Sequence, residues 1–279
     1  RKRITKDMKK RTFLSTPYLV WMIGFIIIPL VIIFQYALTD QDGGFTISNL
    51  LAMFNAIHLK AFIFSLEIAL LCTVICIAIA YPLVMILKRL HLGRKGFVFF
   101  VLILPMWMNF ILRILAWQMI LSSNGILNLF LTKLGFQPLA IANTWVAILI
   151  GVVYDYLPYM VLPIYNSIME IDEDIVEAAR DLGAGPRAVF GKVIFPLSLP
   201  GLMSGIVMVF VPSMTSFVVS DILGGGKLQL IGNVIEQEFL TNMDWHMGSG
   251  LSVMLMIFVL ITTAFTMKND TDGRSSAIW

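Results

Sequence analysis

The chain has 279 residues, of which 58% are hydrophobic and only 13% are charged. Soluble domains use charged residues at roughly 25%, so the composition excludes a soluble domain and is typical of a protein surrounded by lipid. The formal net charge of +3 is small and gives no indication of nucleic-acid binding.

Six runs of mostly apolar residues are long enough to cross a bilayer as helices, for which about 20 residues are needed. In chain order they are Thr16 to Thr39, Ala61 to Leu87, Phe97 to Leu121, Leu139 to Tyr165, Leu197 to Val219 and Met247 to Met267. The runs and their connections use almost the whole chain. The sequence therefore predicts one all-α, polytopic membrane domain, residues 1–279, with a polar hairpin over residues 168–196.

Basic residues are distributed unevenly between the two sides of the predicted domain. Seven Lys or Arg lie between Arg1 and Arg11, and with those around Lys88, in the hairpin and in the tail they make sixteen on one side. The other side holds only three: Lys60, Lys133 and Lys227. By the positive-inside rule, both termini and the hairpin are predicted to be cytoplasmic.

Three ionisable side chains fall within the predicted spans: Glu67, Arg113 and Asp155. Such a group costs at least ~2.5 to 3.5 kcal/mol among lipid-facing residues unless it faces a cavity or a partner. Glu67 lies near the outer end of its span, so it either belongs to a substrate path or simply reaches the interface. For Arg113 we expect a structural role, paired with Asp155 or with backbone carbonyls near Pro105.

Asp155 lies between Tyr154 and Tyr156 in the fourth span. A carboxylate beside aromatic rings at membrane depth suits an organic cation, bound by charge and by cation–π contact. An ion pair with Arg113 that holds two helices together is an equally good interpretation. In the first interpretation these three residues line a substrate path, and Trp107, just before Arg113, is a further candidate.

The outer connections carry six carboxylates: Asp40, Asp42, Asp221, Glu236, Glu238 and Asp244. Together they predict a mouth that attracts cations, and Asp221, at the end of the fifth span, is the outer candidate for the substrate path. This acidity disfavours oxyanions as cargo, although Arg113 keeps that alternative open.

No catalytic or metal-binding pattern emerges from the remaining reactive residues. Cys72 and Cys76 lie four apart in mid-span, which favours packing over a disulfide or a metal site, and the three histidines are scattered over both sides. The run Gly224-Gly225-Gly226-Lys227 lacks the full spacing of a phosphate loop. We expect no metal, no cofactor and no ATP hydrolysis in this chain.

The polar hairpin has the boundary signals of two short helices. Asp172 suits the N-cap of the first, and Glu173 and Asp174 suit the positive end of its dipole. Gly183 suits the left-handed position after a helix end, and Pro186 suits the first turn of the next helix.

The first helix of the hairpin is predicted to have one apolar or small face. Its members recur at three- and four-residue spacing: Ile175, Ala178, Ala179 and Leu182. Glu177, Arg180 and Asp181 project elsewhere. Small residues permit close approach, so we expect this helix to seat in a cleft of another protein; folding back on the bundle is the alternative.

The hairpin resembles the EAA loop of bacterial ABC importer permeases. That pattern is Glu-Ala-Ala, three residues, Gly, nine residues, Ile, one residue, Leu-Pro; here Glu177 begins it, Gly183 is in register, and Val193 and Phe195 replace Ile and Leu. The resemblance implies a type I importer permease fold with six spans. It also implies that a separate ATPase, which binds ATP and Mg, is contacted by a set of hairpin residues: Glu177, Ala178, Ala179, Asp181 and Gly183.

Further segments are similar to the B-type permease subunits of spermidine/putrescine importers: Leu104-Pro105 to Arg113, Leu157-Pro158, Ser220 to Gly225 and Ile231-Gly232-Asn233. The similarity implies import of polyamine across a bacterial cytoplasmic (inner) membrane by alternating access. The implied partners are a homologous second permease, two cytoplasmic ATPase subunits and an external polyamine-binding protein. A permease for an iron complex or an oxyanion, or a secondary transporter, are the alternatives.

Overall fold

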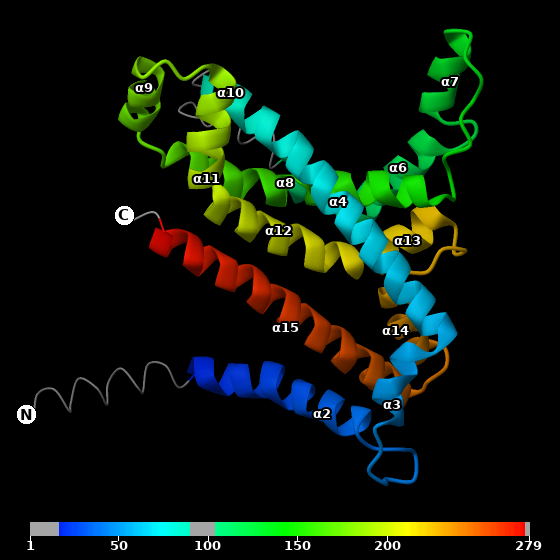
Figure 1. The fold of residues 1–279 in the computed structure, drawn as a ribbon. Coiled ribbons are helices and arrows are strands. Elements are labelled where there is room, and N and C mark those ends of the chain that lie inside the picture. The colour runs from blue at the N-terminus through cyan, green and yellow to red at the C-terminus, as the bar shows by residue number, and fades with distance from the viewer. Residues whose placement is uncertain (1–16, 90–103, 277–279) are drawn as a thin grey trace, which may run out of the picture. The chain divides into compact units, whose positions relative to one another are not determined.

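The computed structural model describes residues 17–89 and 104–276, with side chains through residue 266. Within these residues the regular structure is helical, apart from one isolated β-bridge between Thr39 and Phe45. Five helices are long and apolar enough to cross a membrane, or six if one bent pair is counted as a span. The predicted all-α, polytopic fold is confirmed (Figure 1).

The chain divides into two compact units, Arg1–His58 with Ile235–Phe258, and Leu59–Val234 with Val259–Trp279. The prediction that residues 1–279 form a single domain stays a prediction. The first unit holds the amino-terminal helix, which runs from Pro17 to Ala37 and is π-helical over part of its length.

The elements wholly or partly in the first unit are η1 (Ile23–Ile27), α2 (Ile28–Ala37), α3 (Ser48–Leu51), η2 (Ala52–Phe54), the start of α4 (Ala56–Arg89), most of α14 (Ile231–Leu240) and the start of α15 (Trp245–Ser276). Asn49 of α3 fixes the turn after α2, because its side-chain amide donates to the Thr39 carbonyl at 2.9 Å. Gly250 of α15 lies against the Asn49 backbone, where a Cβ would collide with the carbonyl oxygen. The short α3 is thus held between two longer helices.

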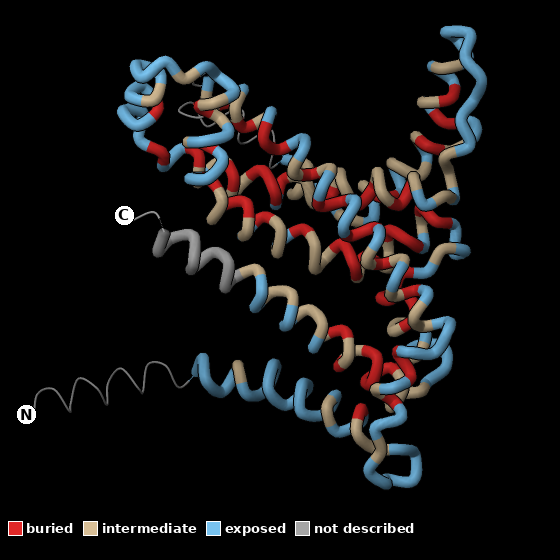
Figure 2. Tube along the Cα trace, in the orientation of Figure 1, coloured by how far each residue is buried: buried red, intermediate tan, exposed pale blue. Residues whose placement is uncertain are grey.

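The second unit contains most of α4 and the elements η4 (Leu104–Trp107), α6 (Phe110–Leu121), α7 (Ile126–Lys133), α8 (Trp145–Met169), α9 (Glu173–Asp181), α10 (Pro186–Val189), η5 (Phe190–Ile194), α11 (Phe195–Leu197), α12 (Leu199–Met214) and α13 (Phe217–Gly224). Helix α8 packs along α12 (Figure 1). Gly205 allows the close approach, since a Cβ there would lie 2.8 Å from the Met160 sulfur. Many residues of these two helices are buried (Figure 2), among them Ile148, Ile164 and Val209.

The third apolar run is not a continuous helix where the structure describes it. Residues 97–103 of the predicted span lie outside the described residues. Beyond them, the short η4 is followed by a break, and α6 starts after Asn109, whose side chain accepts from the Ile111 and Leu112 amides at 3.0 and 3.2 Å. This N-cap interaction starts α6 as a separate helix.

Helix α8 contains two prolines and is not interrupted by them. Pro158 and Pro163 both lie inside this single α-helix. Within a bundle, neighbouring helices and side chains compensate for the backbone hydrogen bonds that proline removes.

The fifth apolar run is broken at both ends of α12. The segments Pro186–Leu197 and Leu199–Met214 meet at Ser198 with a bend of 66°. At the other end α12 stops at Met214, and α13 begins at Phe217. The α-helices α3, α7 and α14 lie outside the predicted spans and hairpin and were not predicted. Helix α13 begins inside the predicted fifth span and extends beyond its end.

Candidate functional site

The α9–α10 hairpin has the boundaries that its sequence predicts. Asp172 caps α9, with its carboxylate accepting from the amide two residues further on at 3.1 Å. Gly183 has φ of +83°. Its amide donates to the Arg180 carbonyl at 2.8 Å, and the Ala184 amide donates to the Ala179 carbonyl at 3.0 Å. This pair of bonds is the Schellman ending of a helix, and Pro186 then starts α10 as predicted.

The base of the hairpin is attached to α4 by an aromatic and polar contact that the sequence did not reveal. The Tyr81 ring lies 5.7 Å from that of Phe190 and 5.6 Å from that of Phe195, measured between centroids. Its hydroxyl is 2.9 Å from the Ser198 hydroxyl, at the bend before α12. On the other side, Lys88 Nζ donates to the Ile168 carbonyl near the end of α8, at 3.3 Å.

The apolar residues of α9 are divided between two faces. Val176 is buried, and Ala179 packs against the hydrophobic core. Ile175 and Leu182 are instead exposed, Leu182 to 89%, and Ala178 is exposed as well. The predicted single stripe of four residues is therefore wrong in one member: Ala179 turns inward, and the other three remain uncovered.

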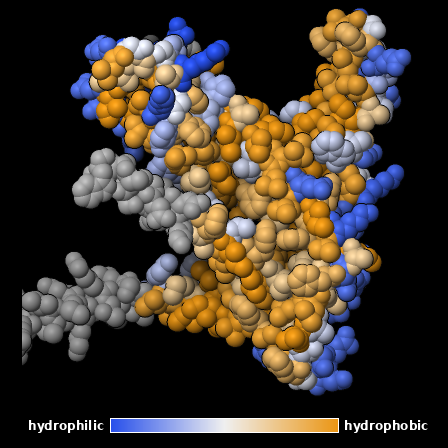
Figure 3. All heavy atoms as spheres, viewed as in Figure 1, coloured by the Kyte–Doolittle hydropathy of each residue, from blue (hydrophilic) through white to orange (hydrophobic). Residues whose placement is uncertain are grey.

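Charged residues surround this uncovered face. Glu177, Arg180 and Asp181 are all exposed, and hydrophilic residues gather over the hairpin in Figure 3, while the bundle beside it is mostly hydrophobic. The α9 helix carries four acids and one base. Its free surface is thus amphipathic and predominantly acidic.

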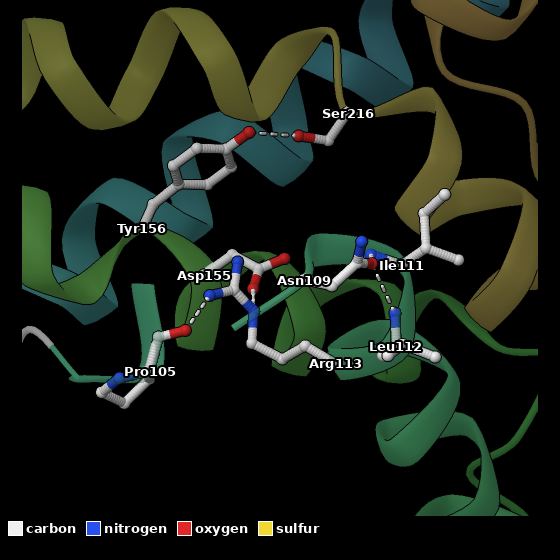
Figure 4. Close-up of polar contacts among 8 residues, drawn as sticks. All are labelled: Pro105, Asn109, Ile111, Leu112, Arg113, Asp155, Tyr156 and Ser216. Atoms are coloured by element: carbon white, nitrogen blue, oxygen red, sulfur yellow. Dashed lines mark hydrogen bonds and ion pairs between the residues drawn. The ribbon is translucent and has the colours of Figure 1, made fainter. Parts of the chain in front are cut away.

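A second polar site lies within the apolar part of the same unit. Arg113 of α6 approaches Asp155 of α8, with 2.7 Å between Nε and Oδ1 (Figure 4). Nη1 of the same guanidinium donates to the Pro105 carbonyl at 2.7 Å. Both partners that the sequence proposed for Arg113 are therefore present. The Nε–H bond is not directed at the carboxylate as in a hydrogen bond, so charge holds the pair together.

Two aromatic rings complete the surroundings of the guanidinium. Its Cζ lies 5.7 Å from the ring centroid of Phe110 and 5.8 Å from that of Tyr154, within the range of a cation–π contact. Tyr156 points elsewhere, with its hydroxyl 2.8 Å from that of Ser216 (Figure 4). Successive residues of an α-helix project about 100° apart, so Tyr154 and Tyr156 project in roughly opposite directions. Only Tyr154 therefore joins this cluster.

The structure does not bring the other predicted substrate-path residues into this cluster. Glu67 is exposed on α4, and Trp107 is 78% exposed in η4. Asp221 is exposed on α13, where it accepts from Asn233 Nδ2 at 2.7 Å. Phe110 was not among the predicted residues, although its position three residues before Arg113 on a helix is a usable signal.

An apolar groove of about 320 Å³ adjoins the cluster through Tyr154. Trp117 of α6 also lines it and meets the Tyr154 ring edge to face, with centroids 5.2 Å apart. Tyr154 therefore has one contact with a cation and another with an apolar groove. In the part of the chain that the structure describes, no group of three His, Cys, Asp or Glu side chains is arranged to hold a metal ion.

Comparisons with known proteins identify the family of this chain. Residues 94–269 match the family described as binding-protein-dependent transport system inner membrane component. The chain belongs to this family of permeases. The matched segment contains both the α9–α10 hairpin and the Arg113–Asp155 cluster.

Two relatives of this permease are spermidine/putrescine transport system permease proteins PotB. That of Haemophilus influenzae is 36% identical over 86% of this chain and 87% of its own length. That of Escherichia coli K12 is 39% identical over 85% of this chain and 89% of its own length. A more distant relative, the inner membrane ABC transporter permease YdcU of Escherichia coli, is 28% identical over 80% of this chain and 75% of its own length.

The fold of the permease is also found in a solved structure. A chain of a bacterial alginate ABC transporter, crystallised in complex with an alginate pentasaccharide-bound periplasmic protein, superposes with a TM-score of 0.79. The match covers 95% of this chain and 94% of that chain at 15% identity. It confirms the predicted type I importer permease fold.

Proposed function

We propose that this permease forms half of the pore of an ATP-driven importer of polyamines such as spermidine and putrescine. The observation that carries the proposal is the 36 to 39% identity to the two PotB proteins over most of both lengths. The cation-binding chemistry of the embedded cluster supports it independently, because the cluster already accommodates an organic cation, the guanidinium of Arg113.

The α9 surface is the proposed contact with the motor. Ile175, Ala178 and Leu182 are apolar or small and exposed, and an amphipathic helix of this kind seats in a groove of a partner. The acidic residues around them, Glu177 and Asp181, would be complementary to a groove with basic residues at its rim. The partner is a separate cytoplasmic ATPase that binds ATP and Mg. Two copies would serve this chain and a homologous second permease.

The hairpin is attached in a way that would transmit movement to the spans. It continues from α8 on one side and through the bend at Ser198 into α12 on the other. The Tyr81 contact adds α4 as a third connection. Closure of the ATPase dimer would therefore move three helices of one unit together, which is what alternating access requires.

The orientation completes this proposal. The excess of Lys and Arg on the hairpin side supports a cytoplasmic location for both termini and the hairpin in a bacterium. The outer carboxylates, Asp221 among them, then face an external polyamine-binding protein and attract its cationic cargo. Asp155 and Tyr154 are the proposed contacts at membrane depth, while Glu67, Trp107 and Tyr156 stay candidates.

The test is uptake by the complete complex in proteoliposomes. The chain should co-purify with an ATPase whose rate rises with spermidine-loaded binding protein, and ATP-dependent uptake of radiolabelled spermidine should follow. Uptake should fall in Asp155→Asn and in Asp221→Asn, whereas Lys133→Gln, an exposed change in α7, serves as the charge control. Uptake by the isolated chain without an ATPase would reject the importer. Transport of an oxyanion instead of spermidine would reject the polyamine assignment.

A further inference from the structure

The contact between Arg113 and Asp155 leaves polar capacity unused. A guanidinium commonly holds a carboxylate through two parallel hydrogen bonds. Here Nε lies 2.7 Å from Oδ1 without forming a hydrogen bond, and Nη1 donates to the Pro105 carbonyl instead. Asp155 Oδ2 is buried and has no hydrogen-bond partner among the residues that the structure describes. The carboxylate can therefore accept from another donor.

The surroundings of the guanidinium suit organic cations in general. One carboxylate and two aromatic rings, those of Phe110 and Tyr154, attract an alkylammonium group as they attract a guanidinium. The groove beside Tyr154 is apolar, so it suits the methylene chain that separates the charges of a polyamine. The cluster thus combines the two kinds of contact that such a ligand needs.

Charge balance determines how cargo could enter this cluster. Asp155 is only 4% exposed, and while it is ionised a carboxylate buried among apolar residues is stabilised by a cation beside it. An arriving ammonium group cannot simply be added, because two cations would then share one buried carboxylate. It has to exchange with the guanidinium.

Arg113 has partners of its own to retain during such an exchange. Pro105 and Phe110 belong to the same stretch of chain, η4 and the first turn of α6, whereas Asp155 belongs to α8. If the guanidinium leaves the carboxylate, it keeps its hydrogen bond to the Pro105 carbonyl and its contact with the Phe110 ring. These two contacts partly replace the attraction of the carboxylate.

We propose that Arg113 is a tethered stand-in for the transported cation, an inference that rests on the proposed function. In the resting state its guanidinium occupies the Asp155 site, and the ammonium group of a polyamine displaces it during transport. Because the competitor is attached to the protein, it acts at a high effective concentration. A ligand with one ammonium group displaces it poorly, and a ligand that makes further contacts displaces it well. Arg113 is thus a specificity-determining residue.

The experiment measures amine selectivity in the complete complex with its binding protein. Spermidine uptake into proteoliposomes is competed with n-butylamine, in wild type, Arg113→Gln, Asp155→Asn, the double variant and the Lys133→Gln control. In Arg113→Gln the concentration of butylamine that halves uptake should fall about tenfold or more, because the site is no longer occupied by its internal competitor. The control should keep the wild-type value.

A static ion pair gives a different pattern. It predicts equal loss of spermidine uptake in the two single variants and recovery in the double variant, which has no buried charge, with selectivity unchanged. That pattern overturns the proposal. The stand-in predicts that Asp155→Asn loses uptake with or without the Arg113 change.

A variant that keeps the charge balance covers the case in which Arg113→Gln does not assemble. Arg113→Lys still neutralises Asp155 but lacks the planar fork that reaches two acceptors, so butylamine should compete severalfold better than in wild type. A wild-type value for this variant overturns the proposal. Absence of spermidine uptake in the wild-type complex rejects the proposed function, whereas normal uptake with unchanged selectivity in the Arg113 variants rejects only the stand-in.

Discussion

The α9–α10 hairpin and the Arg113–Asp155 cluster belong to the same compact unit. They differ in the solvent exposure of their charged side chains. On the hairpin, Glu177 and Asp181 are exposed beside the apolar Leu182, which is itself 89% exposed. In the cluster, two opposite charges are drawn together within the apolar part of the unit, and Asp155 is 4% exposed. The side chains of the hairpin are free to contact a partner protein, whereas the charged groups of the cluster already contact one another.

This difference separates two kinds of recognition. An exposed apolar face between charges is a surface for another folded protein, which covers it permanently or in each cycle. A buried carboxylate with a cation already beside it suits a small ligand that replaces that cation. Helix α8 links the regions, because it carries Asp155 and continues into the hairpin. Changes can therefore be designed to affect one region, the other, or the joint between them.

The largest effect is expected from Gly183→Pro, which breaks the hairpin itself. Gly183 has φ of +83°, whereas proline is fixed near −65° and lacks the amide that now donates to Arg180. A cost of about 3 kcal/mol reduces the population of the native hairpin by roughly a hundredfold. Co-purification of the ATPase and spermidine uptake should both be lost.

Gly185→Ala is the matched control for that change. Gly185 has φ of −69° and open space where a Cβ would be placed, so an alanine fits, at a cost of about 0.5 to 1 kcal/mol for the weaker N-cap. Equal losses in the two variants would show that the hairpin is merely intolerant of substitution. Normal uptake in Gly183→Pro would refute the coupling role.

A smaller but more specific effect is expected from Leu182→Asp, which alters the exposed face without altering the hairpin. The side chain has almost no contact within this chain, so the fold should be unaffected. Burial of a leucine in a partner groove is worth roughly 1.5 to 3 kcal/mol, so the ATPase should dissociate about tenfold or more readily. Leu134→Asp, at an exposed position after α7, is the control. Retention of the ATPase at wild-type levels by Leu182→Asp would place the docking face elsewhere.

The two regions also differ in how far the sequence predicts them. The hairpin boundaries depend on local chemistry, a cap at Asp172, a left-handed glycine at Gly183 and a proline at Pro186, and all three were predicted correctly. The orientation of Ala179 was not, because which face of a short helix packs inward depends on distant residues. Local signals fix where such a helix begins and ends but not what covers it.

Predicting the cluster requires knowing which residues from distant parts of the chain lie together. The sequence offered Asp155 and Pro105 as partners of Arg113, because few other groups could balance a charge in a span, and the structure contains both. It could not choose between Tyr154 and Tyr156, since that choice depends on the rotation of α8 against α6. The bend at Ser198 was likewise missed, as its hydrogen-bond partner Tyr81 is on another helix.

A moderate effect on stability and uptake is expected from Gly201→Ala, which disturbs the packing of α12 against α8, the helix that links the two regions. A Cβ on this residue of α12 would collide with the Pro163 carbonyl oxygen and lie 2.6 Å from the Ser167 Cβ of α8. Forcing the helices apart costs about 1 to 3 kcal/mol. The thermal unfolding midpoint in detergent should fall and uptake should decrease, while the ATPase still co-purifies because the α9 face is unchanged. Gly191→Ala, which has open space for its Cβ, should have neither effect; an equal loss there would mean that α8–α12 packing is not the cause.

The smallest effect is expected from Tyr81→Phe, which removes only the hydroxyl that joins α4 to the bend before α12. Its partner, the Ser198 hydroxyl, is not left unsatisfied, because it also donates to the Phe195 carbonyl at 3.0 Å. The loss should therefore stay near 0.5 to 1.5 kcal/mol, about the net value of one hydrogen bond, and the ring contacts with the hairpin remain. Thermal unfolding of the purified complex measures this cost, with Tyr159→Phe, at a residue that is 39% exposed, as the control.

The ratio of uptake to ATP hydrolysis then tests whether this bond transmits movement. If α4 follows the hairpin through Tyr81, the Tyr81→Phe complex should hydrolyse ATP at the normal rate but import less spermidine per ATP. Ser198→Ala should give the same ratio, and the double variant should show no further loss, since both changes remove one bond. An unchanged ratio in all three would mean that α4 is held by ring packing alone and that the hairpin acts on the pore only through α8 and α12.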